Sequence, residues 1–155
     1  MLLVNQDFLP QVTALISMAQ QSIDIATFKA EITSKPRGRS LRLFFDKLFE
    51  KRANGVEIRF LINWHNERRV VPLTNLAVIH ELKKHKIEVR KLPANRCCHA
   101  KILLVDKKRA VIGSHNLSVR SCHNNFEVSF LVFDPISIDR LSSVFDTTFR
   151  DSQRA

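Results

Sequence analysis

Four polar side chains lie at one end of a segment whose other residues suit a β-hairpin. His99 and Lys101 precede the apolar run at 102–105, and Ser114 and Asn116 follow a second apolar run. Lysine supplies a compact positive charge, and serine and asparagine supply neutral donors, so these three side chains could hold a phosphate. Histidine has a reference pKa of about 6.5 and can attack phosphorus or donate a proton near neutral pH. The residue types therefore predict phosphoryl transfer, which needs an attacker, charge neutralisation and a proton for the leaving oxygen.

The expected register of this hairpin brings the four side chains together. Side chains alternate between the two faces of a strand, so His99 and Lys101 share one face at a spacing of about 7 Å. A turn centred on 107–108 places Lys101 opposite Ser114 and His99 opposite Asn116. Because directly opposed residues project to the same face, this register predicts one convergent polar patch.

Helices and strands that alternate along the first half of the chain must carry this hairpin. Apolar spacing predicts helices over 7–20, 40–54, 73–85 and 135–152, and strands over 22–28, 56–63, 87–92 and 126–133. This order predicts an α/β fold with a mixed, mostly parallel β-sheet flanked by helices on both faces. No linker or internal repeat divides the sequence, so we expect a single catalytic domain over 1–155.

The chain is strongly basic, with a formal net charge of +10 at pH 7. The excess is concentrated around the hairpin, because the segment 83–109 holds ten basic residues and two acidic ones. Such a segment attracts a polyanion, and nucleic acid is the first candidate, with an anionic membrane surface the second.

The hairpin also resembles a known family motif. The segment 99–116, HAKILLVDKKRAVIGSHN, fits the HxKxxxxDxxxxxxGSxN signature of the phospholipase D superfamily. The segments 45–63 and 82–92 are similar to the units that precede this motif in the family, so the resemblance spans nearly the whole chain. Most members carry two motifs; this sequence has one, like the small single-motif endonucleases that pair as homodimers. The six fixed positions of the signature are His99, Lys101, Asp106, Gly113, Ser114 and Asn116.

The resemblance implies a phosphodiesterase that needs no metal and no cofactor. In the enzymes it resembles, one histidine attacks phosphorus to form a covalent phosphohistidine, and the histidine of a second motif protonates the leaving group. With one motif per chain, two copies of His99 would have to meet at a two-fold interface. By resemblance, Lys101, Asn116 and Ser114 bind the phosphate, Glu127 orients the histidine ring, and Asp106 is structural, while Gly113 fits a close backbone approach beside a ligand.

We interpret the sequence as a metal-independent homodimeric endonuclease, with DNA favoured over RNA as the substrate. One alternative is a phospholipid hydrolase of the same superfamily that acts on an anionic lipid such as cardiolipin. Another is a non-catalytic nucleic-acid-binding module of a larger assembly. The apolar runs are too short for a membrane span and the first residues lack a signal-peptide pattern, so we expect a cytoplasmic protein without stable membrane insertion.

Overall fold

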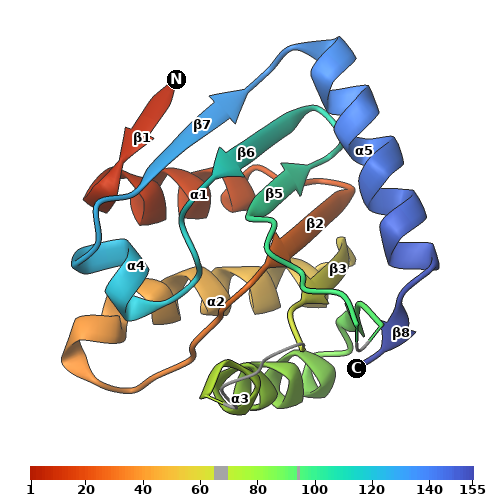
Figure 1. Ribbon diagram of the computed structural model, residues 1–155. Helices are drawn as coiled ribbons and strands as arrows, with labels where there is room; N and C mark the ends of the chain where they lie inside the picture. The colour runs from red at the N-terminus through yellow and green to blue at the C-terminus, as the bar shows by residue number, and fades with distance from the viewer. Residues whose placement is uncertain (65–69, 94) are drawn as a thin grey trace.

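The strands of the computed structural model, which describes residues 1–64, 70–93 and 95–155, form one mixed sheet (Figure 1). Its order is β1-β7-β6-β5-β2-β3-β4-β8. The strands are β1 (Leu2–Val4), β2 (Ser22–Thr27), β3 (Glu57–Ile62), β4 (Glu88–Lys91), β5 (Ile102–Val105), β6 (Arg109–Gly113), β7 (Val128–Val132) and β8 (Gln153–Arg154). The helices are α1 (Phe8–Ser17), α2 (Arg39–Ala53), α3 (Val70–Lys84), α4 (Val119–His123) and α5 (Pro135–Arg150), with short 3-10 turns at Asn5–Asp7 and Pro36–Gly38.

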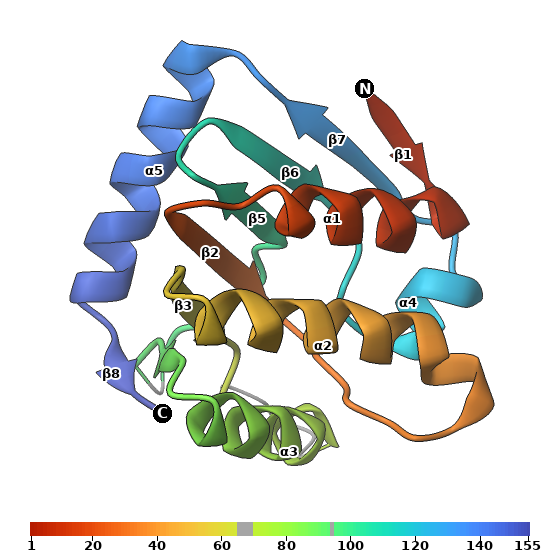
Figure 2. The same ribbon diagram turned by 180° about the vertical axis from the view of Figure 1, so that it is seen from behind.

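Helices cover both faces of this sheet, which confirms the α/β architecture expected from the sequence. The helices α1, α2 and α3 pack on one face, and α5 packs on the other (Figures 1 and 2). The larger core lies under the first three helices and contains the fully buried rings of Phe44, Phe45 and Phe60. Phe145 and Phe149 of α5 form a smaller core on the opposite face. Within the described residues, no helix is long and apolar enough to cross a membrane.

The spacing of apolar residues explains why α2 forms and where it packs. Its buried residues recur every three or four positions, so they form one stripe that faces the sheet. The helix ends at Asn54 and Gly55, where Gly55 adopts a positive φ of 90° that few other residues tolerate. The stripe consists of Leu41, Phe44, Phe45, Leu48 and Phe49.

The sheet is more antiparallel than the sequence predicted. The strand pairs β2–β3 and β3–β4 are parallel, whereas the pairs β1–β7, β7–β6, β6–β5, β5–β2 and β4–β8 are antiparallel. The expectation of a mostly parallel sheet was wrong because only the helical crossovers α2 and α3 create parallel neighbours. Short connections such as the β5–β6 turn create antiparallel ones. The edge strands β1 and β8 were too short to be recognised from the sequence.

The hairpin register also differs from the prediction by one residue. Ile102 pairs with Ile112 and Val105 pairs with Arg109, so three residues, 106–108, form the turn. Asp106 and Lys107 adopt positive φ values of 53° and 51°, which a two-residue turn at 107–108 did not anticipate. Lys101 therefore lies opposite Gly113 and not opposite Ser114, since the Gly113 N–H donates to the Lys101 carbonyl at 3.3 Å.

The carboxylate of Asp106 fixes this turn against the start of β2. It accepts the backbone N–H groups of Gln20, Gln21 and Ser22 at 2.7–3.1 Å. Burial acts to raise the pKa of Asp106, but these three donors outweigh it and the net pKa is lowered. Asp106 therefore anchors the far end of the hairpin, at the opposite end of β5 from His99.

Candidate active site

His99 and Lys101 lie side by side in the extended segment that leads into β5. The Lys101 Nζ is 3.1 Å from His99 Nδ1 and donates to the His99 carbonyl at 2.6 Å. Both side chains lie beside the ring of Phe28, which follows β2. The centroids of the Phe28 and His99 rings are 5.0 Å apart, and Lys101 Nζ is 5.4 Å from the Phe28 centroid. His99 is exposed and Lys101 is half-buried, so one end of the sheet presents an accessible imidazole beside a positive charge.

The Lys101 ammonium determines which form His99 adopts. Burial and the neighbouring Lys101 charge both lower the pKa of His99, so the imidazole is neutral near pH 7. Burial also lowers the pKa of Lys101, because it disfavours the charged ammonium. An ammonium can only donate, so Nδ1 of His99 accepts from it and the neutral ring carries its hydrogen on Nε2. For Nε2 to attack phosphorus, the hydrogen has to move to Nδ1. To give a proton to a leaving oxygen, the ring has to be charged as the imidazolium, because proton loss from the neutral ring would leave an imidazolate.

Two buried asparagines hold the segments that carry these groups. Asn75 of α3 donates to the carbonyls of Phe28 and Asn63 at 3.0 and 2.8 Å, and its Oδ1 accepts the Ala30 N–H at 2.9 Å. Asn63, just after β3, accepts the Cys98 N–H at 3.0 Å. Because both asparagine side chains are fully buried, these bonds form away from competing water. They fix the segment after β2 and the segment before β5 relative to each other.

Asn116 lies at the same end of the sheet. Its Oδ1 accepts the Lys29 N–H at 3.1 Å, and its own N–H donates to Ser121 Oγ at 2.8 Å. The next residue, Leu117, donates its N–H to the Lys29 carbonyl at 3.1 Å. Among the described residues, the Asn116 Nδ2 has no hydrogen-bond partner, so its N–H groups can donate to an anionic oxygen. Lys29 directly follows Phe28, whose ring lies beside His99 and Lys101. The bond between Asn116 and Lys29 therefore connects Asn116 to that pair.

Glu127 acts on Asn116 through Ser121 and does not contact His99 in the described structure. Its buried carboxylate accepts from Ser121 Oγ at 2.8 Å and from Asn125 Nδ2 at 2.9 Å. Burial acts to raise the pKa of Glu127, but the donors Ser114, Asn125 and Ser121 outweigh it and keep the group ionised. The expectation that Glu127 orients the histidine ring therefore has no counterpart within one chain.

Ser114 is turned toward β7. Its Oγ accepts the Val128 N–H at 3.1 Å and donates to the Val128 carbonyl at 3.3 Å. With Lys101 opposite Gly113, the register does not bring Ser114 face to face with Lys101. A phosphate contact from the Ser114 hydroxyl would require its O–H to turn away from the Val128 carbonyl.

Sequence reasoning missed Phe28, Lys29 and Ser121 as parts of this site. Phe28 ends the predicted strand 22–28, and its half-buried ring lies against His99. Ser121 lies on α4, which is too short for a periodic signal. The sequence signal for α4 is the helix-capping residue Ser118, three residues before Ser121. Ser118 accepts the Ser121 N–H at 3.3 Å.

The close approach of the neighbouring strand β7 requires a glycine at position 113. A Cβ at this position would lie 2.2 Å from Ser129 Oγ and 2.4 Å from both Ser129 Cα and the Val128 carbonyl oxygen. Two of these atoms belong to the β7 backbone, which cannot move aside as a flexible side chain can. The glycine thus permits the close pairing of β6 and β7.

Replacing Gly113 with alanine is predicted to lower the free energy of unfolding by about 1–3 kcal/mol, the usual cost of overpacking. Urea denaturation of wild type and Gly113→Ala measures this loss. Ala110→Gly on the same strand is a control for glycine entropy in a strand, which costs about 0.5–1 kcal/mol. A Gly113→Ala protein as stable as wild type would contradict the close approach.

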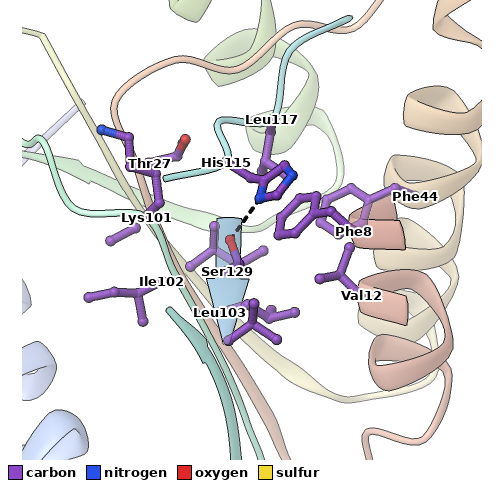
Figure 3. A pocket seen from close by; sticks show the side chains of 13 residues that line it. Phe8, Val12, Thr27, Phe44, Lys101, Ile102, Leu103, His115, Leu117 and Ser129 are labelled. Carbon is purple, nitrogen blue, oxygen red and sulfur yellow. Dashed lines mark hydrogen bonds between the residues drawn. The ribbon is translucent and has the colours of Figure 1, made fainter. Parts of the chain in front are cut away.

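His115 lies in the wall of a small internal cavity and not among the exposed polar groups. Its ring stacks on Phe8 with centroids 4.3 Å apart. Nε2 donates to the Asn5 carbonyl at 3.1 Å, and Nδ1 accepts from Ser129 Oγ at 2.8 Å (Figure 3). The cavity has a volume of about 20 Å³ and is also lined by Lys101. With both ring nitrogens paired, His115 is a structural histidine held in its neutral form.

Stability is predicted to fall as pH drops through the histidine range, with His115 as one source. Burial lowers the pKa of His115 in the folded state, against a smaller opposing effect of Asn5 and Glu127. Its contribution is therefore fully present above the unfolded value of about 6.5 and is lost as pH falls below it. The free energy of unfolding, measured in urea, should fall less between about pH 7.5 and 5.5 for His115→Gln than for wild type. Equal losses would contradict this assignment.

The basic residues of 83–109 do not form one surface. Lys107, Lys108 and Arg109 lie at the β5–β6 turn, at the other end of the hairpin from His99. Lys107 pairs with Asp146 of α5 at 2.9 Å. The charge next to the site therefore depends on residues from other parts of the chain.

Comparison with known proteins identifies the family. Residues 12–149 match a family model described as "Cardiolipin synthase, PLD-like domain". The chain belongs to the phospholipase D-like (PLD-like) family. This confirms the family assignment that the 99–116 motif indicated.

The PLD-like chain aligns with parts of longer relatives. It is 27% identical over 110 residues to a phospholipase D of Rickettsia bellii, covering 71% of this chain and 52% of the relative. It is 30% identical over 92 residues to a cardiolipin synthase of Halalkalibacterium halodurans, covering 59% of this chain and 18% of that protein. The chain thus matches about half the length of one relative and less than a fifth of the other.

Among solved structures, Nuc of Salmonella typhimurium, described as a phospholipase D family member, superposes with a TM-score of 0.80. The alignment covers 100% of this chain and 97% of that chain at 16% sequence identity. At this identity, the likeness shows that the two share the PLD-like fold.

Proposed function

We propose that this PLD-like chain hydrolyses phosphodiester bonds of nucleic acid through a covalent phosphohistidine at His99, without a metal. The observation that carries the proposal is the exposed His99 in contact with Lys101, at the sheet end where the Asn116 amide can donate. An imidazole, an ammonium and a carboxamide provide the attacker, the positive charge and the neutral donor that phosphoryl transfer requires. A pKa of His99 below its ordinary value keeps the attacking form available near pH 7.

The first chemical step joins nitrogen to phosphorus. A bound phosphate draws the Lys101 ammonium away from Nδ1, so the ring hydrogen can move to Nδ1 and free the Nε2 lone pair. Nε2 then attacks phosphorus in line as the bond to the leaving oxygen breaks. The leaving oxygen takes a proton from the Nε2–H of a second ring, which enters the step as the imidazolium, favoured by the negative phosphate, and leaves it as neutral imidazole. That second ring then removes a proton from water, which attacks phosphorus and restores the first His99.

The second imidazole is His99 of another copy of the chain. Of the other described histidines, His115 is buried, His85 stacks on Phe49 with centroids 3.8 Å apart, His123 pairs with Ser40 at 3.1 Å, and His80 is exposed on α3. A two-fold axis beside His99 would place two identical rings on either side of one phosphate. Each ring could then serve as attacker or acid.

An exposed apolar row next to His99 offers the surface for this second copy. Leu2, Phe130 and Ile112 are neighbours across β1, β7 and β6 and remain 51%, 55% and 38% exposed. They lie on the face that α5 covers further along the same strands, where Ala110 packs against Ile138. In Figure 1, β1 lies at the edge of the sheet, away from α5. Ile112 directly precedes Gly113, which bonds to the Lys101 carbonyl, so the row borders the site.

The charge of the chain favours nucleic acid as the substrate. A formal net charge of +10 attracts a polyphosphate backbone, with DNA favoured over RNA as in the sequence interpretation. The names of the matched relatives, a phospholipase D and a cardiolipin synthase, support the second candidate, a lipid phosphodiester. Both substrates present the same phosphodiester to His99, so the distinction has to be measured.

The test is a substrate panel in excess EDTA. Single- and double-stranded DNA, RNA and vesicles containing cardiolipin are incubated with the protein, and the products are separated. Cleavage of nucleic acid in EDTA supports the proposal, and the strand type narrows the substrate. Hydrolysis of the lipid alone would identify the lipid, and not nucleic acid, as the substrate. Activity only with added metal would overturn the metal-free mechanism.

A further inference from the structure

A basic groove runs beside the proposed site, between the 29–40 loop and α4. Two hollows of about 1050 and 560 Å³ share Pro36, Arg37 and Asn124 in their walls, so they form one continuous depression. The 29–40 loop forms one wall, and the α4 region, with Arg120 and His123, forms the other. Figures 1 and 2 show this loop passing close to α4 at the same side of the molecule.

The groove carries four cations that the described carboxylates do not neutralise. Lys35, Arg37, Arg39 and Arg120 are exposed in its walls, and none forms an ion pair with a described carboxylate. The acidic residue in the wall, Glu31, is already paired. It contacts Lys29 Nζ at 2.7 Å and accepts the Val119 N–H at 3.0 Å. The groove is therefore strongly positive and presents guanidinium groups, which bind phosphate in a planar, bidentate manner.

Both walls are attached to the segment that carries Asn116. The loop begins at Lys29, whose N–H bonds to Asn116 Oδ1, and Ala30 bridges to Leu117. The other wall, α4, begins two residues after Leu117 and contains Ser121, which accepts the Asn116 N–H. A strand whose phosphate binds at Asn116 would therefore continue directly into the groove.

We propose that this groove binds the phosphodiester backbone of the nucleic acid next to the cleaved bond. The inference rests on the proposed function and adds a second binding site to it, with Arg37 and Arg120 as the phosphate contacts on opposite walls. His99 and Lys101 act on one phosphate, and the groove holds the neighbouring ones. The groove thus confers a preference for a chain of nucleotides over a single phosphodiester.

The experiment compares two pairs of substitutions that remove equal charge. The groove pair is Arg37→Gln with Arg120→Gln, and the control pair is Lys108→Gln with Arg140→Gln, which are exposed at the β5–β6 turn and on α5. Binding of a labelled single-stranded DNA oligonucleotide is measured against salt in a His99→Ala background. The groove pair should weaken binding about tenfold or more and reduce the slope of log K against log salt by about 1–2, as expected for two lost contacts. In proteins that keep His99, hydrolysis of a dinucleotide should be equal for wild type, the groove pair and the control pair.

The other outcomes distinguish failure of the groove proposal from failure of the proposed function. Groove and control pairs with the same affinity and the same salt slope would show that only net charge matters. A groove pair that loses binding to phosphatidylglycerol vesicles but keeps oligonucleotide affinity would assign the groove to a membrane. If wild type binds DNA through the groove but cleaves no nucleic acid in EDTA, the proposed function fails and the groove stands. If wild type cleaves nucleic acid in EDTA but the groove pair and the control pair bind the oligonucleotide equally, the groove proposal fails and the proposed function stands.

Discussion

Replacement of His99 with alanine is expected to reduce phosphodiester hydrolysis at least about 10⁴-fold, because both proposed imidazoles are removed at once. In a two-fold assembly, one substitution removes the attacker and the acid of the same site. The His99 side chain is exposed, so its loss should leave the free energy of unfolding within about 0.5 kcal/mol of wild type. Initial rates in EDTA on the best substrate of the panel measure the loss.

A matched control is His80→Ala, which removes an exposed histidine from α3. It should retain wild-type rates, and far-ultraviolet circular dichroism should be the same for all three proteins. A His99→Ala protein within tenfold of wild type would remove His99 from the chemistry. Equal losses in both variants would point to a general effect on the protein.

Replacement of Phe130 with aspartate is expected to produce a monomer with activity reduced at least about 100-fold at concentrations where wild type is dimeric. Phe130 is the central member of the apolar row and lies between Leu2 and Ile112. A charge there would be buried without a partner in a dimer, which costs several kcal/mol. In the free chain the side chain is 55% exposed, so the fold tolerates the change.

Val144→Asp is the control, because Val144 is also 55% exposed but lies on α5. Sedimentation velocity and rates in EDTA are measured for the three proteins over a range of concentrations. The control should remain dimeric and active. An active Phe130→Asp monomer would contradict the shared site, whereas a Phe130→Asp dimer with wild-type activity would place the interface elsewhere.

The helices and strands could be predicted from the sequence because their burial is periodic. In α2, the spacing from Leu41 to Phe49 specifies both the helix and its buried face. The motif placed His99, Lys101 and Asn116 correctly at one end of the sheet, since residues close in sequence to β5 and β6 remain close in space.

The details of the site depend on contacts that the sequence does not display. The hairpin slips by one residue because Asp106 and Lys107 adopt positive φ values without a glycine to mark them. The strand β5 begins at Ile102, so strict alternation does not apply to His99 and Lys101. The connection of Glu127 to Asn116 through Ser121 requires the fold of α4, which is one and a half turns long at most.

The distribution of charge along the sequence did not predict which charges lie near the site in the folded chain. The basic segment 83–109 is contiguous in sequence, but the fold separates Lys107–Arg109 from His99 by the length of β5. Instead, the loop at 29–40, whose first residue bonds to Asn116, and Arg120 bring unpaired cations into one groove. Proximity between segments far apart in the sequence is a property of the sheet order, and only the structure supplies it.

The most direct test of the account is to trap the covalent intermediate. Substrate labelled at the scissile phosphate is mixed with excess protein in EDTA, and the reaction is quenched in alkali, where a phosphorus–nitrogen bond to histidine survives. The account predicts label on the wild-type protein that maps to His99, is released by acid and is missing from His99→Ala. Hydrolysis in EDTA under single-turnover conditions with no label on the protein, or label on another residue, would contradict it.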